Sequence, residues 1–171
     1  MAGEIERVTP PKTARPRDEL GRPMPRGTEP RLVLPDFDVL SIDECHRRGI
    51  QYFDAAVYFG AHEAWETAWR MARKNGDPDE EFFKGLSQLG AGYTHYQRGN
   101  PRGAHTLMHR GVGRIRPYGV RSGGRHRGID VDALATATEA NMARLDGLAR
   151  GDAMPPIETP RVTGSSGPIL E

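Results

Sequence analysis

The sequence is poor in several kinds of feature, and each shortage excludes a class of protein. Cys45 is the only cysteine, which rules out an intrachain disulfide framework and any zinc site built from cysteines alone. No apolar run approaches the roughly 20 residues that a membrane-spanning helix needs. The N-terminal stretch MAGEIERVTPPK carries charges where a signal peptide needs an apolar segment. We therefore expect a cytoplasmic protein that does not enter a membrane.

The composition predicts one folded domain between two tails. With 36% hydrophobic and 27% charged residues, the 171-residue chain has room for a single core. Half of its 14 prolines precede Asp36. Because proline fixes φ and lacks an amide donor, residues 1–36 are predicted to form an extended or disordered tail. Residues 151–171 have the same character and are predicted to be a flexible tail, which leaves residues 37–150 as the folded domain.

Capping residues and apolar periodicity predict helices, and no stretch alternates as a strand of a sheet would. The first predicted helix runs from the capping box at Ser41 to about Asp54, and the second covers the apolar positions that follow, to Asn75. The third runs from an N-cap at Asp77 to Arg98, and the fourth from an N-cap at Asn100 to the turn before Pro117. The fifth runs from about Val131 to Arg150. Short connections favour antiparallel neighbours. The fold class is therefore all-α: a single antiparallel bundle of about five helices with disordered or extended tails.

Polar residues recur at helical spacing on two of these helices. His62 and Glu66 share one helix face, with Glu63 beside them. A second line, on the next helix, consists of Gly85, Gln88, Gly92 and His95. Gly90 is a third glycine of this helix. Each glycine inside a helix costs roughly 0.8–1 kcal/mol relative to alanine, so the three are expected to let another backbone approach. The polar groups predicted to meet between the two helices are His62, Glu63, Glu66, Gln88 and His95.

Two interpretations of this polar cluster stay open. In the first, His62, Glu66 and His95 bind a divalent metal ion or do acid–base chemistry, supported by hydrogen bonds from Gln88 and Asn100. In the second, the same groups satisfy one another as a structural clamp. The sequence lacks the His-Glu-x-x-His motif of zinc proteases and the paired Glu-x-x-His motif of di-iron bundles.

The distribution of charge suggests a third possibility. No Asp or Glu occurs from Phe82 to Ile129, whereas nine Lys and Arg do. Such a stretch could bind nucleic acid or an acidic protein, with an affinity that falls steeply with salt. The candidate residues are Arg102, Arg110, Arg114, Arg121, Arg125 and Arg127. A solvated face, paired with acids of another helix, is the simpler interpretation.

No motif names a reaction. The sequence has no Gly-x-Ser-x-Gly elbow, no phosphate-binding loop and no dinucleotide fingerprint. The chain is therefore interpreted as a helical domain with a possible ligand or metal site, a polyanion-binding module, or a structural protein.

Two segments, YFGAHEAWETAWR and FFKGLSQLGAGYTHYQRGNPRGAHTLM, resemble the signature of the domain of unknown function 309 family. The resemblance covers roughly Phe53 to Ile115 and a Gly-Ile-Asp before the last helix. The residues that carry it are His62, Glu63, Glu66, Trp69, Gly85, Leu86, Gln88, His95, Arg98, Gly99, Asn100, Gly103 and Ala104. It implies an all-α bundle without an established activity. The loop RSGGRHRG looks longer and more basic than is usual in that family.

Overall fold

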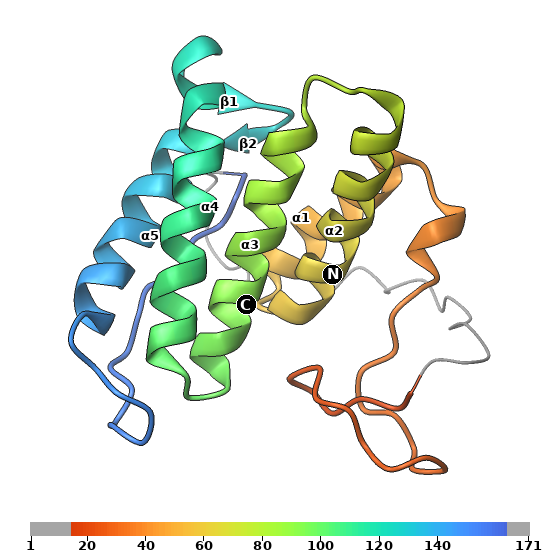
Figure 1. The fold of residues 1–171 in the computed structure, drawn as a ribbon, viewed down its shortest axis with the longest axis vertical. Helices are drawn as coiled ribbons and strands as arrows, with labels where there is room; N and C mark the ends of the chain where they lie inside the picture. The colour runs from red at the N-terminus through yellow and green to blue at the C-terminus, as the bar shows by residue number, and fades with distance from the viewer. Residues whose placement is uncertain (1–14, 164–171) are drawn as a thin grey trace, which may run out of the picture.

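The computed structural model describes residues 15–163 and confirms the all-α class (Figure 1). Residues 1–14 and 164–171, the outer parts of the predicted tails, lie outside the described residues. The elements are a 3-10 turn Phe37–Val39 and helices α1 (Ile42–Asp54), α2 (Tyr58–Asn75), α3 (Glu80–Gln97), α4 (Pro101–Arg121) and α5 (Val131–Leu145), with strands β1 (Arg125–His126) and β2 (Ile129–Asp130) before α5. Among residues 15–163, no helix combines the length and apolar character needed to cross a membrane.

The starts of α1 and α4 are set by the caps that the sequence predicts. Ser41 Oγ accepts a hydrogen bond from the Glu44 amide (3.1 Å), and Asn100 Oδ1 accepts one from the Gly103 amide (3.1 Å). The predicted start of α3 was wrong. Asp77 Oδ1 accepts from the amide only two residues on (2.8 Å), so Asp77 and Pro78 form a turn and the helix begins at Glu80.

Two predicted helix ends also needed correction. Pro117 lies inside α4 and not after it, and Tyr118, whose hydroxyl donates to Pro78 O (2.9 Å), is buried in the turn that follows. Packing of Tyr118 offsets the single backbone hydrogen bond that the proline removes. Helix α5 ends at Leu145 and not at Arg150, because the chain becomes extended and Gly147 takes a left-handed φ of 76°.

The loop after α4 forms a small antiparallel hairpin that the sequence did not predict. His126 pairs with Ile129, and the two residues between them, Arg127 and Gly128, both have positive φ (46° and 77°). Positive φ at both positions is the requirement of a two-residue hairpin turn with the twist of a β-ribbon. Each strand is only two residues long, which is too short to show the alternation of apolar and polar residues that predicts a strand.

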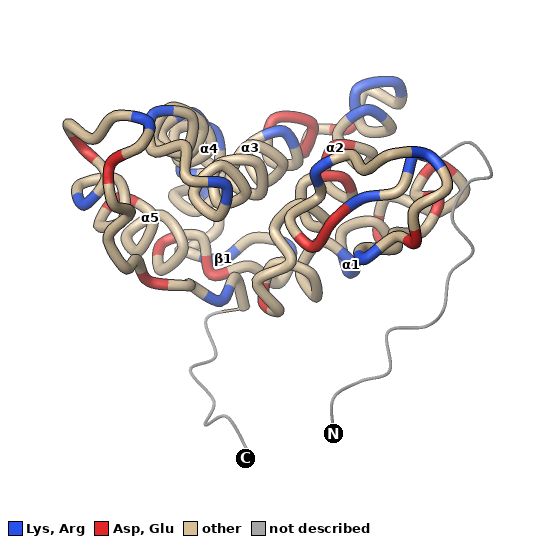
Figure 2. The backbone as a smooth tube through the Cα atoms, turned by 90° about the horizontal axis from the view of Figure 1, so that it is seen from below, with Lys and Arg blue, Asp and Glu red and all other residues tan. Residues whose placement is uncertain are grey.

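The helices pack in the order of the sequence, so that α3 lies in the middle of the bundle (Figures 1 and 2). Its buried side carries three aromatic residues and two leucines of the core. Phe82, Phe83, Leu86, Leu89 and Tyr93 are all fully buried, together with Trp65 of α2. Burying such side chains is the main source of stability for the bundle.

The described parts of the two predicted tails are extended and lie against the bundle. Residues 15–35, here called the N-terminal arm, are fixed by Arg98, which donates to Leu20 O through Nε (3.1 Å) and a terminal nitrogen (2.8 Å). At the other end, Val162 is fully buried, and its amide donates to Asp54 Oδ1 (2.9 Å). The domain limits at 37 and 150 stay predictions, although contacts of the bundle extend past both.

Candidate functional site

Helix α2 gathers one histidine and two carboxylates on its surface, and these residues, His62, Glu63 and Glu66, are here called the His62 cluster. His62 Nε2 lies 3.3 Å from Glu66 Oε2 and 3.8 Å from Glu63 Oε1. One ligand atom from each residue lies within 4.8 Å of the other two, and all three side chains are partly exposed. Helical spacing places Glu66 on the same face as His62, because residues four apart are neighbours on a helix surface, and Glu63 reaches Nε2 only at the longer distance.

A backbone carbonyl fixes the tautomer of His62. Its Nδ1 lies 3.1 Å from Ser87 O and 3.0 Å from Ser87 Oγ, on α3. A carbonyl oxygen can only accept, so Nδ1 carries the proton. In the neutral ring, Nε2 then presents its lone pair to the two carboxylates. A histidine that ligates a metal commonly donates its other ring N–H to a carbonyl in this way.

The approach of α2 to α3 depends on Gly90. A Cβ at this position would lie 2.8 Å from the backbone nitrogen of His62 and 2.9 Å from its Cα. No side chain larger than hydrogen fits between the two backbones, and this proximity brings the Ser87 carbonyl within reach of the His62 ring.

The other half of the predicted polar cluster makes its hydrogen bonds elsewhere. Gln88 Oε1 accepts from Arg114 Nε of α4 (2.9 Å), and His95 Nδ1 accepts from Asn100 Nδ2 (3.0 Å). Gly85 and Gly92 likewise pack on α4, against Ile115 and Met108. The hydrogen bonds of Gln88 and His95 thus go to Arg114 and Asn100 and not to His62, and their meeting with His62 stays a prediction.

The group in the described residues whose geometry could hold a metal ion is different from the predicted one. It contains His62, Glu63 and Glu66, and His95 is not part of it. Burial lowers the pKa of His95, and nearby positive charge, first that of Arg98, lowers it further. The residues of α3 that contact His62 are Ser87 and Gly90. Gly90 is one of the glycines predicted to let another backbone approach, whereas Ser87, three positions before it, was missed by the sequence predictions.

The N-terminal arm lies next to the His62 cluster. Phe59, whose ring centroid is 6.2 Å from that of His62, is covered by the guanidinium groups of Arg17 (4.7 Å) and Arg98 (5.6 Å). Gly21 of the arm sits so close to this ring that a Cβ there would overlap it, at 2.2 Å from Phe59 Cγ. Phe59 is thus the contact that holds the arm beside the cluster.

Half of the predicted polyanion-binding arginines are engaged with acidic residues. Arg114 pairs with Glu81, Arg125 with Asp130 (3.5 Å), and Arg127 with Asp43 and Asp79. In the part of the chain that the structure describes, Arg102, Arg110 and Arg121 have no acidic partner. Positive and negative residues are interspersed in Figure 2. The arrangement supports a solvated, partly paired face more than a continuous basic surface.

A second polar network, absent from the sequence predictions, joins α1, α2 and the hairpin. Trp65 Nε1 donates to His46 Nδ1 (3.0 Å), and His46 Nε2 donates to Arg127 O (2.8 Å). All of these groups lie far apart in the sequence. His46 is buried, so its neutral tautomer is fixed by one accepted and one donated hydrogen bond.

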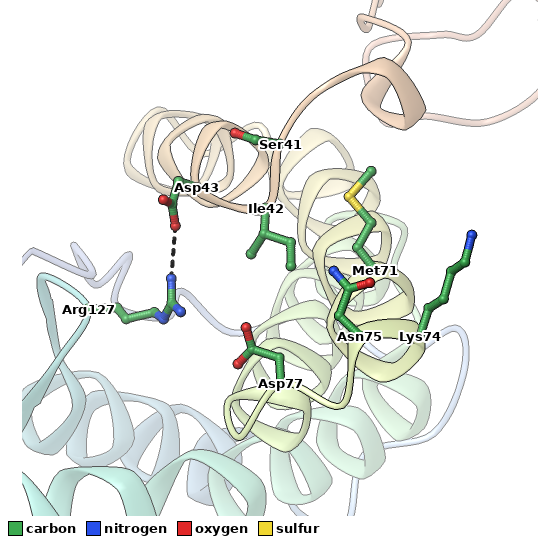
Figure 3. Close-up of a pocket in the computed structure, with 8 residues that line it drawn as sticks. All are labelled: Ser41, Ile42, Asp43, Met71, Lys74, Asn75, Asp77 and Arg127. Atoms are coloured by element: carbon green, nitrogen blue, oxygen red, sulfur yellow. Dashed lines mark hydrogen bonds and ion pairs between the residues drawn. The ribbon is translucent and has the colours of Figure 1, made fainter.

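Arg127 extends this network to α3 and to the surface. Its guanidinium pairs with Asp79 and lies 5.0 Å from the centroid of the Phe83 ring. It also donates a hydrogen bond to Asp43 (3.0 Å), and both residues line an open cleft of about 610 Å³ (Figure 3). The cleft is lined by Ser41, Ile42, Asp43, Met71, Lys74, Asn75, Asp77 and Arg127. Two acids and two bases balance in this lining, so the cleft has no clear preference for a charged ligand.

Comparison with known protein families gave a match to the part of the chain that contains the His62 cluster. The family model described as domain of unknown function (DUF309) matches residues 46–107. This stretch, here called the DUF309 region, is thus similar to the DUF309 family. The matched stretch contains the His62 cluster, Ser87, Gly90 and both residues of the His46–Trp65 bond, whereas Asp43 and the hairpin lie outside it. No curated protein and no solved structure matched the chain.

The arm adds a cavity to the DUF309 region. The cavity has a volume of about 320 Å³, and Glu63 of the His62 cluster forms part of its wall. The other lining residues come from the arm and the 3-10 turn: Arg15, Pro16, Arg17, Pro30, Leu32, Val33, Leu34, Pro35 and Phe37. We call it the arm cavity.

Protonation of His46 is expected to destabilise the DUF309 region. Burial lowers the pKa of His46 from its usual 6.5, and the opposing effect of the Arg127 carbonyl is smaller. As the pH falls below about 6.5, the unfolded chain binds a proton that the folded ring resists. The stabilising contribution of His46 is therefore complete above that pH and is lost as the pH falls toward the lower, folded-state pKa.

This pH dependence can be measured by urea denaturation at about pH 7.5 and about pH 5.5. Wild-type protein should lose more stability between the two than His46→Gln, since an amide can replace both hydrogen bonds without titrating. The same loss of stability is measured for His95→Gln, which removes a different histidine whose pKa is also lowered. Equal losses in wild type and His46→Gln would refute the assignment.

Proposed function

We propose that the DUF309 region of this protein binds a divalent transition-metal ion through His62 Nε2 and the carboxylates of Glu63 and Glu66. The observation that carries the proposal is the hydrogen bond of His62 Nδ1 to the Ser87 carbonyl (3.1 Å). It leaves Nε2 facing two carboxylates, and either a metal ion or a proton on Nε2 would balance their negative charge. One imidazole and two carboxylates suit zinc, manganese or ferrous iron.

The geometry favours a site that is open to a further ligand. Three protein ligands leave at least one coordination position of such an ion for water or for a substrate atom. The cluster is partly exposed, and Glu63 also faces the arm cavity. A bound ion would supply Lewis acidity there, and the chain would supply its position through the Ser87 and Gly90 contacts.

Calorimetric titration of the full chain with Zn²⁺ and with Mn²⁺ tests the proposal. Wild type should bind one ion, and His62→Ala should bind none. Glu66→Gln should weaken binding at least about tenfold, because the amide carries no charge and ligates poorly. His95→Ala is the matched control: it removes a histidine of the neighbouring helix and should leave affinity unchanged.

The structural-clamp interpretation predicts a different result. If Nε2 is protonated, the imidazolium pairs with Glu66 and needs no ion. Wild type would then bind no metal, while His62→Ala would still lower the free energy of unfolding. That outcome would reject the metal site.

A further inference from the structure

We infer that the arm cavity binds a small carboxylate with an apolar body, and that the carboxylate ligates the metal ion of the His62 cluster. This inference rests on the proposed metal site and assigns that site a class of ligand. Its basis is the position of Glu63, which belongs to both the His62 cluster and the wall of the cavity.

The size and lining of the arm cavity suit an apolar body. Its volume of about 320 Å³ falls within the range of about 300–1,000 Å³ that is usual for small-molecule sites. The apolar members of the lining are Pro16, Pro30, Leu32, Val33, Leu34, Pro35 and Phe37. Val33 is 48% exposed, which is unusual for a large hydrophobic residue in this chain. A ligand in the cavity would remove such apolar surface from water.

The arm cavity is formed without a ligand, because the arm is anchored on both sides of it. The amides of Arg31 and Leu32 donate to Arg17 O (2.9 and 3.2 Å), which pairs the outgoing and returning parts of the arm. Arg98 holds the bend at Leu20. A ligand therefore does not have to order these walls, and less binding free energy is lost to conformational entropy.

The charges around the arm cavity determine the head group. Its charged residues are Glu63, Arg15 and Arg17. Arg15 Nε donates to Met24 O (3.1 Å) and one terminal nitrogen of Arg17 donates to Gly21 O (2.7 Å), and each guanidinium has five donors in all. The three charged residues sum to a charge of +1, and a divalent ion beside Glu63 would make the lining more positive and more attractive to an anion. A carboxylate can ligate the ion and accept hydrogen bonds from arginine at once.

The metal ion thus adds to the attraction that Arg15 and Arg17 already offer a carboxylate in the arm cavity. Without it, the negative charge of Glu63 opposes a carboxylate, whereas with it the same position attracts one. Binding of the ion and of the carboxylate must then be coupled: each raises the affinity for the other by the same factor.

The test uses octanoate as the probe, titrated into the full chain loaded with Zn²⁺. We expect octanoate to bind at least about tenfold more tightly than acetate, which lacks the apolar body, and than octanol, which lacks the charge. Saturating octanoate should raise Zn²⁺ affinity by the factor by which Zn²⁺ raises octanoate affinity. Val33→Asp, in the cavity wall, should weaken octanoate at least about tenfold without changing Zn²⁺ affinity.

Val39→Asp is the matched control, because Val39 is 77% exposed and is not part of the lining. It should bind octanoate like wild type. Equal affinity for octanoate and acetate, or no effect of Val33→Asp, would overturn the inference while leaving the metal site intact. Failure of wild type to bind Zn²⁺ would appear in the metal titration itself, before any octanoate is added, and would reject the proposed function together with the head-group assignment.

Discussion

Replacing Asp79 by Asn is expected to lower the free energy of unfolding by about 2–3 kcal/mol, because one carboxylate connects the hairpin to α3. Its side chain is 13% exposed; it accepts from His126 Nε2 (2.9 Å) and pairs with Arg127. Burial acts to raise the pKa of Asp79, but the hydrogen bonds from Arg127 and His126 lower it on balance.

The expected loss is smaller than the about 3–5 kcal/mol for breaking a fully buried pair. The side chains of Arg127 and His126 are 29% and 22% exposed, so water can replace part of what the carboxylate provides. Arg127→Asn should cost a similar amount. Asparagine tolerates the left-handed φ of this turn position, so the variant removes the ion pair and keeps the turn.

Urea denaturation measures both variants, with Glu139→Gln as the control. Glu139 pairs with Arg116 at 2.5 Å, but the two side chains are 48% and 42% exposed. Exposed pairs of this kind contribute about 0–1 kcal/mol. If Asp79→Asn costs no more than Glu139→Gln, the hairpin is not held by this carboxylate.

Two glycine-to-alanine substitutions should change stability in opposite directions. Gly113→Ala, on the exposed side of α4, should stabilise the fold by up to about 1 kcal/mol, because alanine is the better helix former. A Cβ there meets no atom within 4 Å outside its own helix backbone, among the residues described. Gly90→Ala should destabilise by about 1–3 kcal/mol, since its Cβ would meet backbone atoms of His62 at 2.8 and 2.9 Å.

Both variants gain the same helix propensity, so the difference between their free energies of unfolding, measured by thermal or urea unfolding, reports the cost of forcing α2 away from α3. Gly90→Ala should also weaken metal binding, because separating the helices moves His62 from the Ser87 carbonyl. Equal stability of the two variants would mean that the helices can separate at little cost, and would remove the structural reason for a glycine at this position.

The sequence by itself determined the local features of this fold. Ser41 and Asn100 cap the helices that they were predicted to cap, because a cap needs only an amide a few residues away. The arrangement of His62, Glu63 and Glu66 is equally local, since one turn of a helix sets it. The helix boundaries predicted at Asp77, Pro117 and Arg150 were wrong, because a turn or a buried side chain outweighed the capping and helix-breaking preferences of these residues.

The tertiary structure alone decided which faces meet. Helix α3 has small residues on two sides, and the sequence does not say that Gly90 faces α2 while Gly85 and Gly92 face α4. That rotation gives Gln88 and His95 the partners Arg114 and Asn100, and it places Ser87 against His62. Asp79 and Arg127 stand 48 positions apart, and no periodicity relates residues at such a distance. Their pairing depends on the packing of the whole bundle, in which the burial of every helix face is decided together.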